Sequence, residues 1–166
     1  MDLKKRWEET FNNSVSSSLD EIRITYTDPL GMEVEEVPYE FVGIESEWMG
    51  AYLRKKNLLK DGKIVFALNR DKIYDRMKSH LLHRSMRNTK MQARILVYHE
   101  VGHGLLDYVR SLQPTEIQIP NIDDETIVTE FARHSSERHT LESDSILEKI
   151  VFEIIGNSKN HITLKS

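Results

Sequence analysis

Two histidines and a glutamate stand at a spacing that suits metal-dependent hydrolysis. His99, Glu100 and His103 form the pattern His-Glu-x-x-His. Residues four positions apart lie on the same face of a helix, so both imidazoles can reach one ion. Glu100 is rotated by about 100° from His99, which lets its carboxylate contact a water on the ion rather than the ion itself. Zinc lowers the pKa of such a water towards about 7, and a carboxylate can then take its proton.

The residues around this motif favour a metal site over a chance occurrence of three fixed positions. The motif lies in a segment compatible with a helix and directly follows the aliphatic run 95–97. It also contains Gly102 and Gly104. Each glycine inside a helix costs about 1 kcal/mol relative to alanine. We therefore expect neighbouring elements to pack closely against the motif at these two positions.

The run His99–Leu106, His-Glu-Val-Gly-His-Gly-Leu-Leu, resembles the active-site helix of zincin metallopeptidases. It is especially similar to the ImmA/IrrE-type family of small intracellular proteins, whose site is of the gluzincin type. The metzincin variant requires a third histidine six residues after the second, and that position is Val109. The resemblance therefore implies a Zn²⁺ site completed by a ligand from farther along the chain.

In the resembled family the third ligand is a glutamate that opens a helix six residues before a Phe-Ala pair. Glu125 has that place here, before Phe131 and Ala132 and 22 positions after His103. Asp124 is the main alternative, because it lies nearer the centre of the apolar stripe of the expected helix. Glu130 points towards the polar side, where an exposed surface acid is the simpler interpretation, and a later histidine also remains open.

Further residues are candidates for supporting roles. Zincins commonly place a His or Tyr opposite the metal to polarise the substrate carbonyl, and His134 and His139 are candidates for this role. An exposed surface histidine is the simpler interpretation of each. Tyr98 and Tyr108 are weaker candidates, expected to be packing residues. Asp107, one turn after the second motif histidine, either orients that imidazole or is a plain surface carboxylate.

The composition narrows the class of protein. The 166 residues include no cysteine, which excludes a disulfide scaffold, a Cys-ligated zinc finger, an iron–sulfur protein and a thiol enzyme. The length suits one domain with a substantial core. No apolar run is long enough to cross a bilayer, and the first residues lack the pattern of a signal peptide. We therefore expect a cytoplasmic protein without a membrane partner, and the net charge of −4 argues against nucleic acid as the main partner.

The helices and strands expected around the motif indicate a single α+β domain over residues 1–166. The resemblance implies a small zincin-like domain, with a short mixed or antiparallel sheet packed on the motif helix and on further C-terminal helices. We expect an N-terminal helix in 1–18, ended by the serine-rich patch 12–18, then a strand-containing part over 19–69 and a mainly helical part over 70–166.

Periodicity and turn residues give the individual elements. The strands are expected at 22–26 and 32–37, joined as a hairpin by the turn Asp28–Gly31, and at 63–69. The helices are expected at 47–57 (capped by Ser46), after a cap at Asp71, at 88–110, at 124–134, and from Ile146 to an end at Gly156. An irregular connection is expected between Pro114 and Pro120.

These features favour a zinc-dependent metallopeptidase acting on a selective intracellular protein or peptide substrate. In this hypothesis His99 and His103 bind Zn²⁺ together with Glu125, the ligand that the resemblance implies, and Glu100 activates the water. By resemblance to zincins, strand 63–69 is a candidate for the edge strand that holds an extended peptide, although its sequence suits a central strand equally well. A chain this small has little room for a broad cleft, which favours a selective enzyme.

Two other functions remain open. The chain could be a zincin-like regulatory or interaction protein without proteolysis, although a structural metal site has no need of Glu100. It could also bind nucleic acid through the segment 70–94, whose net charge is +6, while the segment 116–153 carries −7. The simpler interpretation of the basic segment is a solvated helix face that pairs with the acidic segment in the fold.

Overall fold

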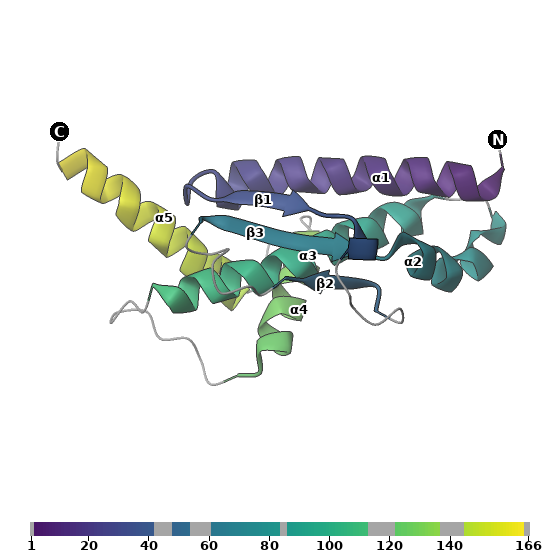
Figure 1. Ribbon diagram of the computed structural model, residues 1–166. Helices are drawn as coiled ribbons and strands as arrows, with labels where there is room; N and C mark the ends of the chain where they lie inside the picture. Colours follow the sequence, from purple (N-terminus) through teal and green to yellow (C-terminus); the bar gives the residue numbers. More distant parts are fainter. Residues whose placement is uncertain are drawn as a thin grey trace.

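The computed structural model describes residues 2–41, 48–53, 61–83, 86–112, 122–136 and 145–164. Within these residues five α-helices accompany a three-stranded mixed sheet (Figure 1), which confirms the α+β prediction. The strands are β1 (Glu33–Glu36), β2 (Gly50–Tyr52) and β3 (Lys63–Leu68), in the spatial order β1-β3-β2. β1 pairs with β3 in parallel and β2 pairs with it antiparallel.

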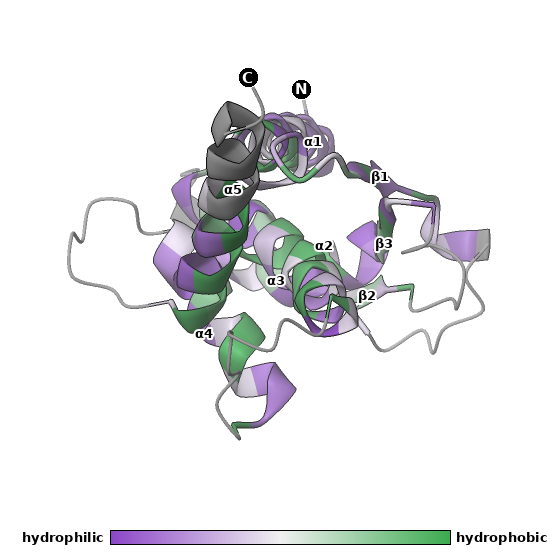
Figure 2. Ribbon diagram, turned by 90° about the vertical axis from the view of Figure 1, so that its left-hand side faces the viewer, coloured by the Kyte–Doolittle hydropathy of each residue, from purple (hydrophilic) through white to green (hydrophobic). Residues whose placement is uncertain are grey.

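Helix α3 forms the centre of the molecule and carries the histidine motif. The α-helices are α1 (Leu3–Ile22), α2 (Arg70–Met77), α3 (Arg87–Ser111), α4 (Asp124–Ser136) and α5 (Ile146–Leu164). Seen from the side, α3 lies below α1, with the sheet to one side of it and α4 and α5 to the other (Figure 2). The motif is thus held by packing from several layers, and the bounds of α3 and α4 agree with the predicted helices.

The first helix is longer than predicted because its buried face continues through the serine-rich patch. Val15 and Leu19 extend the buried row that begins with Trp7 and Phe11, whereas Ser16 and Ser17 are exposed. Asp2 caps this helix, and its carboxylate accepts a hydrogen bond from the backbone N–H of Lys5 at 2.8 Å. Burial of this apolar row outweighs the low helix propensity of serine.

The strand predicted over residues 22–26 is wrong. The chain continues from α1 into a short π-helix, Arg23–Thr27. Ile22 and Tyr26 are buried one helical turn apart, but Ile24 between them is 75% exposed. The apolar alternation of this segment therefore does not correspond to one buried face of a strand. The predicted hairpin is absent as well, because β1 pairs with β3, but the turn before β1 is present and Gly31 adopts φ +70° there.

The helix predicted over residues 47–57 is also wrong where the structure describes it. Residues 50–52 form β2, and Trp48, expected to face inward, is 54% exposed. Two backbone hydrogen bonds hold the segment to β3: Asn69 N–H donates to the carbonyl of Met49 at 2.8 Å, and Leu53 N–H donates to that of Val65 at 2.9 Å. The expected cap Ser46 and residues 54–57 lie outside the described residues.

Strand β3 is the central strand of the sheet and not its edge. It pairs with β1 on one side and β2 on the other, and all its residues from Ile64 to Leu68 are buried. The sequence suited either position, and burial on both faces is typical of a central strand. The strand at the edge of the sheet that contacts α3 is β2.

Two helix ends differ from the prediction. Asn69, rather than Asp71, caps α2, and its side chain accepts a hydrogen bond from Lys72 N–H at 3.2 Å. Helix α5 continues through Gly156 to Leu164. Short 3₁₀ segments lie at Tyr39–Phe41 and Lys78–His83. None of the helices in the described part of the chain is both long and apolar enough to cross a membrane.

Candidate metal centre

His99, His103 and Glu125 meet between α3 and α4. Glu125 Oε1 lies 2.8 Å from His99 Nε2, and Glu125 Oε2 lies 3.3 Å from His103 Nε2. The two imidazole rings have centroids 5.0 Å apart and planes 81° apart. One ligand atom from each of the three residues lies within 4.8 Å of the other two. This group could therefore hold a metal ion.

Close packing between the two helices brings Glu125 to the histidines. A Cβ added at Gly102 would lie 3.0 Å from Phe131 Cδ1 and 3.1 Å from Val128 Cγ1 on α4. Phe131 and Val128 are buried and face α3, which orients the first turn of α4 towards the motif. Gly102 was expected to permit close packing, and it does so against α4, the helix that carries Glu125.

Gly104 permits the corresponding approach on the sheet side of α3. A Cβ added there would lie 2.9 Å from Ile64 Cγ1 and 3.0 Å from Ile64 Cδ1, with Cγ2 nearer still. Ile64 belongs to β3 and is fully buried. The two glycines therefore let α4 and the sheet approach α3 from different sides at the position of the histidines.

Glu100 is buried beside the three-residue group, on the side of β2. Only 7% of it is exposed. Burial, reinforced by the charge of Glu125, raises the pKa of Glu100 from 4.5 to about 7, although a hydrogen bond from the Tyr52 backbone N–H lowers it. The pKa of this carboxyl group thus lies near neutral pH, in the range that suits proton exchange with a neighbouring group.

Strand β2 contributes residues that the sequence did not indicate. The ring of Tyr52 stacks on the imidazole of His103 at 6.4 Å between centroids, with planes 7° apart. A Cβ added at Gly50 would lie 3.2 Å from Glu100 Oε1. Three residues are too few for an alternating pattern to show, and the only local signal was the small pair Gly50 and Ala51, next to Tyr52.

The alternative third ligands are engaged elsewhere. Both carboxylate oxygens of Asp124 face Arg110, one at 2.7 Å and the other at 2.5 Å. Glu130 was expected to be an exposed surface acid, but it is half-buried, and its carboxylate accepts a hydrogen bond at 3.0 Å from the backbone N–H of Ile146 at the start of α5. Of these three acids, the structure brings only Glu125 to the histidines.

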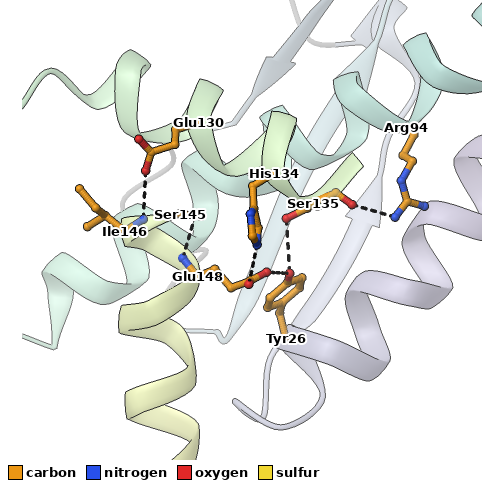
Figure 3. A network of polar contacts seen from close by, with 8 residues as sticks. All are labelled: Tyr26, Arg94, Glu130, His134, Ser135, Ser145, Ile146 and Glu148. Atoms are coloured by element: carbon orange, nitrogen blue, oxygen red, sulfur yellow. Dashed lines mark hydrogen bonds and ion pairs between the residues drawn. The ribbon is translucent and has the colours of Figure 1, made fainter. Parts of the chain in front are cut away.

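His134 belongs to a polar network away from the motif histidines (Figure 3). Its Nε2 lies 2.8 Å from Glu148 Oε1, and the hydroxyl of Tyr26 donates to the other oxygen of Glu148 at 2.5 Å. Ser135 joins the network through Tyr26 at 3.4 Å and through its carbonyl, which accepts from Arg94 at 2.9 Å. His134 is therefore neither at the metal group nor a simple surface histidine. It helps to link α4 to α5 and to the π-helix.

The remaining supporting candidates have separate outcomes. Tyr98 is fully buried and makes ring contacts with Tyr26 and Phe131, which confirms it as a packing residue. Tyr108 is partly buried against the core. A role for Asp107 in orienting His103 stays a prediction. His139 lies outside the described residues, as does the connection between Pro114 and Pro120.

The basic segment 70–94 forms ion pairs with the N-terminal part of the chain. Arg70 binds Glu36 through two nitrogens at 2.7 and 3.0 Å, and Arg94 binds Glu21 through two nitrogens at 2.5 and 2.6 Å. Among the residues that the structure describes, these two arginines pair with acids of the first 36 residues and with no acid of the segment 116–153.

Comparisons with models of known protein families, with curated proteins and with solved structures find no significant match to this chain. The chain is an α+β protein whose His99, His103 and Glu125 could hold a metal ion.

Proposed function

We propose that this protein is a zinc-dependent peptidase, with His99, His103 and Glu125 as metal ligands and Glu100 as the base. The observation that carries the proposal is the convergence of Glu125, from a separate helix, on both motif histidines, with a buried carboxyl group beside them. A structural site has no use for Glu100 at this position. The same arrangement is the one implied by the resemblance to the ImmA/IrrE-type family.

The donor set fits zinc. Two imidazole nitrogens and one carboxylate are the ligands of many catalytic zinc sites, which leave a fourth position for water or substrate. Zinc–nitrogen and zinc–oxygen bonds of about 2.0–2.2 Å bring ligand atoms within about 3.5 Å of one another. The three residues here place ligand atoms within 4.8 Å, so small side-chain rotations suffice. When bound, zinc would acidify a water molecule and polarise the carbonyl of a peptide bond.

Glu100 supplies the proton transfers. Its carboxylate accepts a proton from the attacking water as the water oxygen bonds to the carbonyl carbon. It then delivers that proton to the amide nitrogen, whose bond to the same carbon breaks, releasing a carboxylic acid and an amine. Burial of Glu100 favours the protonated form of its carboxyl group, which helps it to hold the proton between the two transfers.

Strand β2 supplies an edge beside these groups for an extended peptide. Met49 C=O and Leu53 N–H bond to β3. Because backbone groups alternate in direction along a strand, those of Gly50 and Tyr52 face away from β3. Tyr52 N–H contacts Glu100, so this side of β2 borders the reacting groups. A peptide added here would lie across the metal group by strand addition, and we propose an intracellular protein as its source.

A comparison of wild type with Glu100→Gln tests the proposal. Both proteins are loaded with zinc, their zinc content is measured by mass spectrometry, and each is incubated with a peptide library derived from a proteome. We expect equal zinc content, with new peptide N-termini produced by wild type and at least a hundredfold fewer by the variant. If both hold zinc and neither cleaves more than buffer alone, the chain is a metal-binding protein without peptidase activity.

A further inference from the structure

An apolar pocket lies beside the start of β2. Its volume is about 450 Å³, within the range of ~300–1,000 Å³ typical of ligand pockets. Four apolar side chains line it, Met49, Met77, Met91 and Ile95, and the polar residues Arg76, His80, Asn88 and Gln92 complete the lining. Met91 is 46% exposed, although it is a large apolar residue. Methionine side chains are flexible and adapt to apolar partners of different shapes.

The pocket borders the face of α3 that carries His99. Asn88, Gln92 and Ile95 line it, and they precede His99 at helical spacing on one face. With a rise of about 1.5 Å per residue, Ile95 lies about 6 Å from His99 along the helix axis and Gln92 about 10 Å. An extended peptide advances about 3.4 Å per residue. The pocket is thus two or three substrate residues from the metal group.

The direction of β2 determines which side of the cleaved bond reaches the pocket. Met49, directly before β2, lines the pocket, whereas Tyr52, at the end of β2, stacks on His103. Antiparallel pairing is slightly more stable per residue than parallel pairing. A peptide paired antiparallel to β2 passes the histidines first and reaches the Met49 end with its C-terminal part.

We propose that this methionine-lined pocket binds a long apolar side chain, Leu, Met or Phe, two or three residues to the C-terminal side of the bond that is cleaved. The proposal rests on the peptidase function for the position of that residue. Recognition itself depends on the pocket alone. The chain would therefore be a peptidase selective for apolar residues at one position, with the extended backbone held by β2.

Peptide binding without hydrolysis tests the pocket separately from the peptidase activity. Blocked, fluorescently labelled peptides of about eight residues, identical except for Leu or Ser at one position, are titrated into the zinc-loaded Glu100→Gln protein by fluorescence anisotropy. The same titrations use Met91→Glu in that background. Ile24→Glu is the matched control, because it also introduces a charge at an exposed apolar residue.

We expect the Leu peptide to bind at least tenfold more tightly than the Ser peptide, as the burial of one long apolar side chain implies. Met91→Glu should reduce this preference at least fivefold, and Ile24→Glu should leave it unchanged. Equal binding of both peptides, or a preference that survives Met91→Glu, would overturn the pocket assignment. These results do not depend on whether wild type cleaves peptides.

Cleavage products test the direction of the substrate. In the wild-type library digest, apolar residues should be enriched two or three positions after the cleaved bond, and Met91→Glu should remove the enrichment. Enrichment before the bond instead would overturn the antiparallel placement.

Discussion

Gly104→Ala tests whether the close approach of the sheet to α3 is as tight as the structure shows. The new methyl group would lie 2.9 and 3.0 Å from two carbons of Ile64 and closer to a third. Carbon atoms prefer separations of about 3.5–4.0 Å. Ile64 is fully buried in the central strand, so neither it nor α3 can withdraw without disturbing other contacts.

The magnitude follows from two opposing contributions. Alanine gains about 1 kcal/mol over glycine in a helix, and overpacking a core typically costs about 1–3 kcal/mol. We expect a net loss of up to about 2 kcal/mol, which for a chain of this length lowers the melting temperature by up to roughly 4–8 °C. Gly156→Ala is the matched control, because nothing lies within 4 Å of the added Cβ and the position is helical. That variant should gain up to about 1 kcal/mol.

Urea denaturation followed by far-UV circular dichroism measures both free energies of unfolding. Adding Ile64→Ala removes the atoms that conflict with the new methyl group. A double-mutant cycle should therefore show a favourable coupling of about 1 kcal/mol or more between positions 64 and 104. If Gly104→Ala stabilises the protein as much as Gly156→Ala does, or if the coupling is zero, the packing argument is refuted.

Three further predictions concern the buried Glu100, the polar network around Tyr26 and the contact between α3 and α4. Because the pKa of Glu100 is raised in the folded, metal-free protein, its free energy of unfolding should fall as pH rises from 4.5 to about 7. Glu100→Gln lacks this loss and should be more stable than wild type by up to about 3 kcal/mol at about pH 8. Denaturant unfolding at several pH values measures both free energies, and the same pH dependence in variant and wild type would contradict the prediction. Burial and the hydrogen bond to Glu148 raise the pKa of Tyr26, so wild type should lose stability as pH rises above 10, where the unfolded chain ionises. Tyr26→Phe should be about 1.5–3 kcal/mol less stable at neutral pH and should lack that alkaline decline; an identical decline in both would show that Tyr26 is not its source. Gly102→Ala should lower zinc affinity about tenfold, because the added Cβ would displace Phe131 and with it the helix that carries Glu125. Calorimetric titration measures this affinity, and an unchanged value would contradict the claim that close packing at Gly102 positions Glu125.

The two histidines of the candidate metal centre could be predicted because their relation is local. His99 and His103 lie one turn apart on one helix, so their spacing alone places both imidazoles on one face. Glu125 was predicted as the third ligand from the family resemblance and not from spacing, since no local rule relates residues 22 positions apart. The structure brings it to the histidines through close packing of α4 at Gly102.

The two predictions that were wrong, the helix over 47–57 and the strand over 22–26, concern segments whose structure depends on contacts with residues distant in sequence. β2 has three residues and is held by pairing with β3 and by its contact with α3. Such a segment has no pattern of its own, and the apolar spacing of Trp48, Tyr52 and Leu53 suited a helix equally well. Likewise, Ile22 and Tyr26 occupy alternate positions that suit a strand, but they are buried one helical turn apart, and Ile24 between them is exposed.

The position of β3 in the sheet shows the same limit. Its continuous apolar sequence is compatible with a central strand or with an edge covered by helices. Which one it forms is decided by β1 and β2, and the pairing partners are not encoded in β3 itself. The candidate substrate-binding edge and the methionine-lined pocket beside it follow only from that pairing.

Calorimetric titration of zinc into the metal-free protein tests the central claim most directly. Wild type should bind about one zinc per chain. Glu125→Ala should lower the affinity at least a hundredfold, whereas Asp124→Ala, which removes only the partner of Arg110, should retain wild-type affinity within about threefold. Full zinc affinity in Glu125→Ala, or its loss in Asp124→Ala alone, would contradict the ligand set on which the proposed function depends.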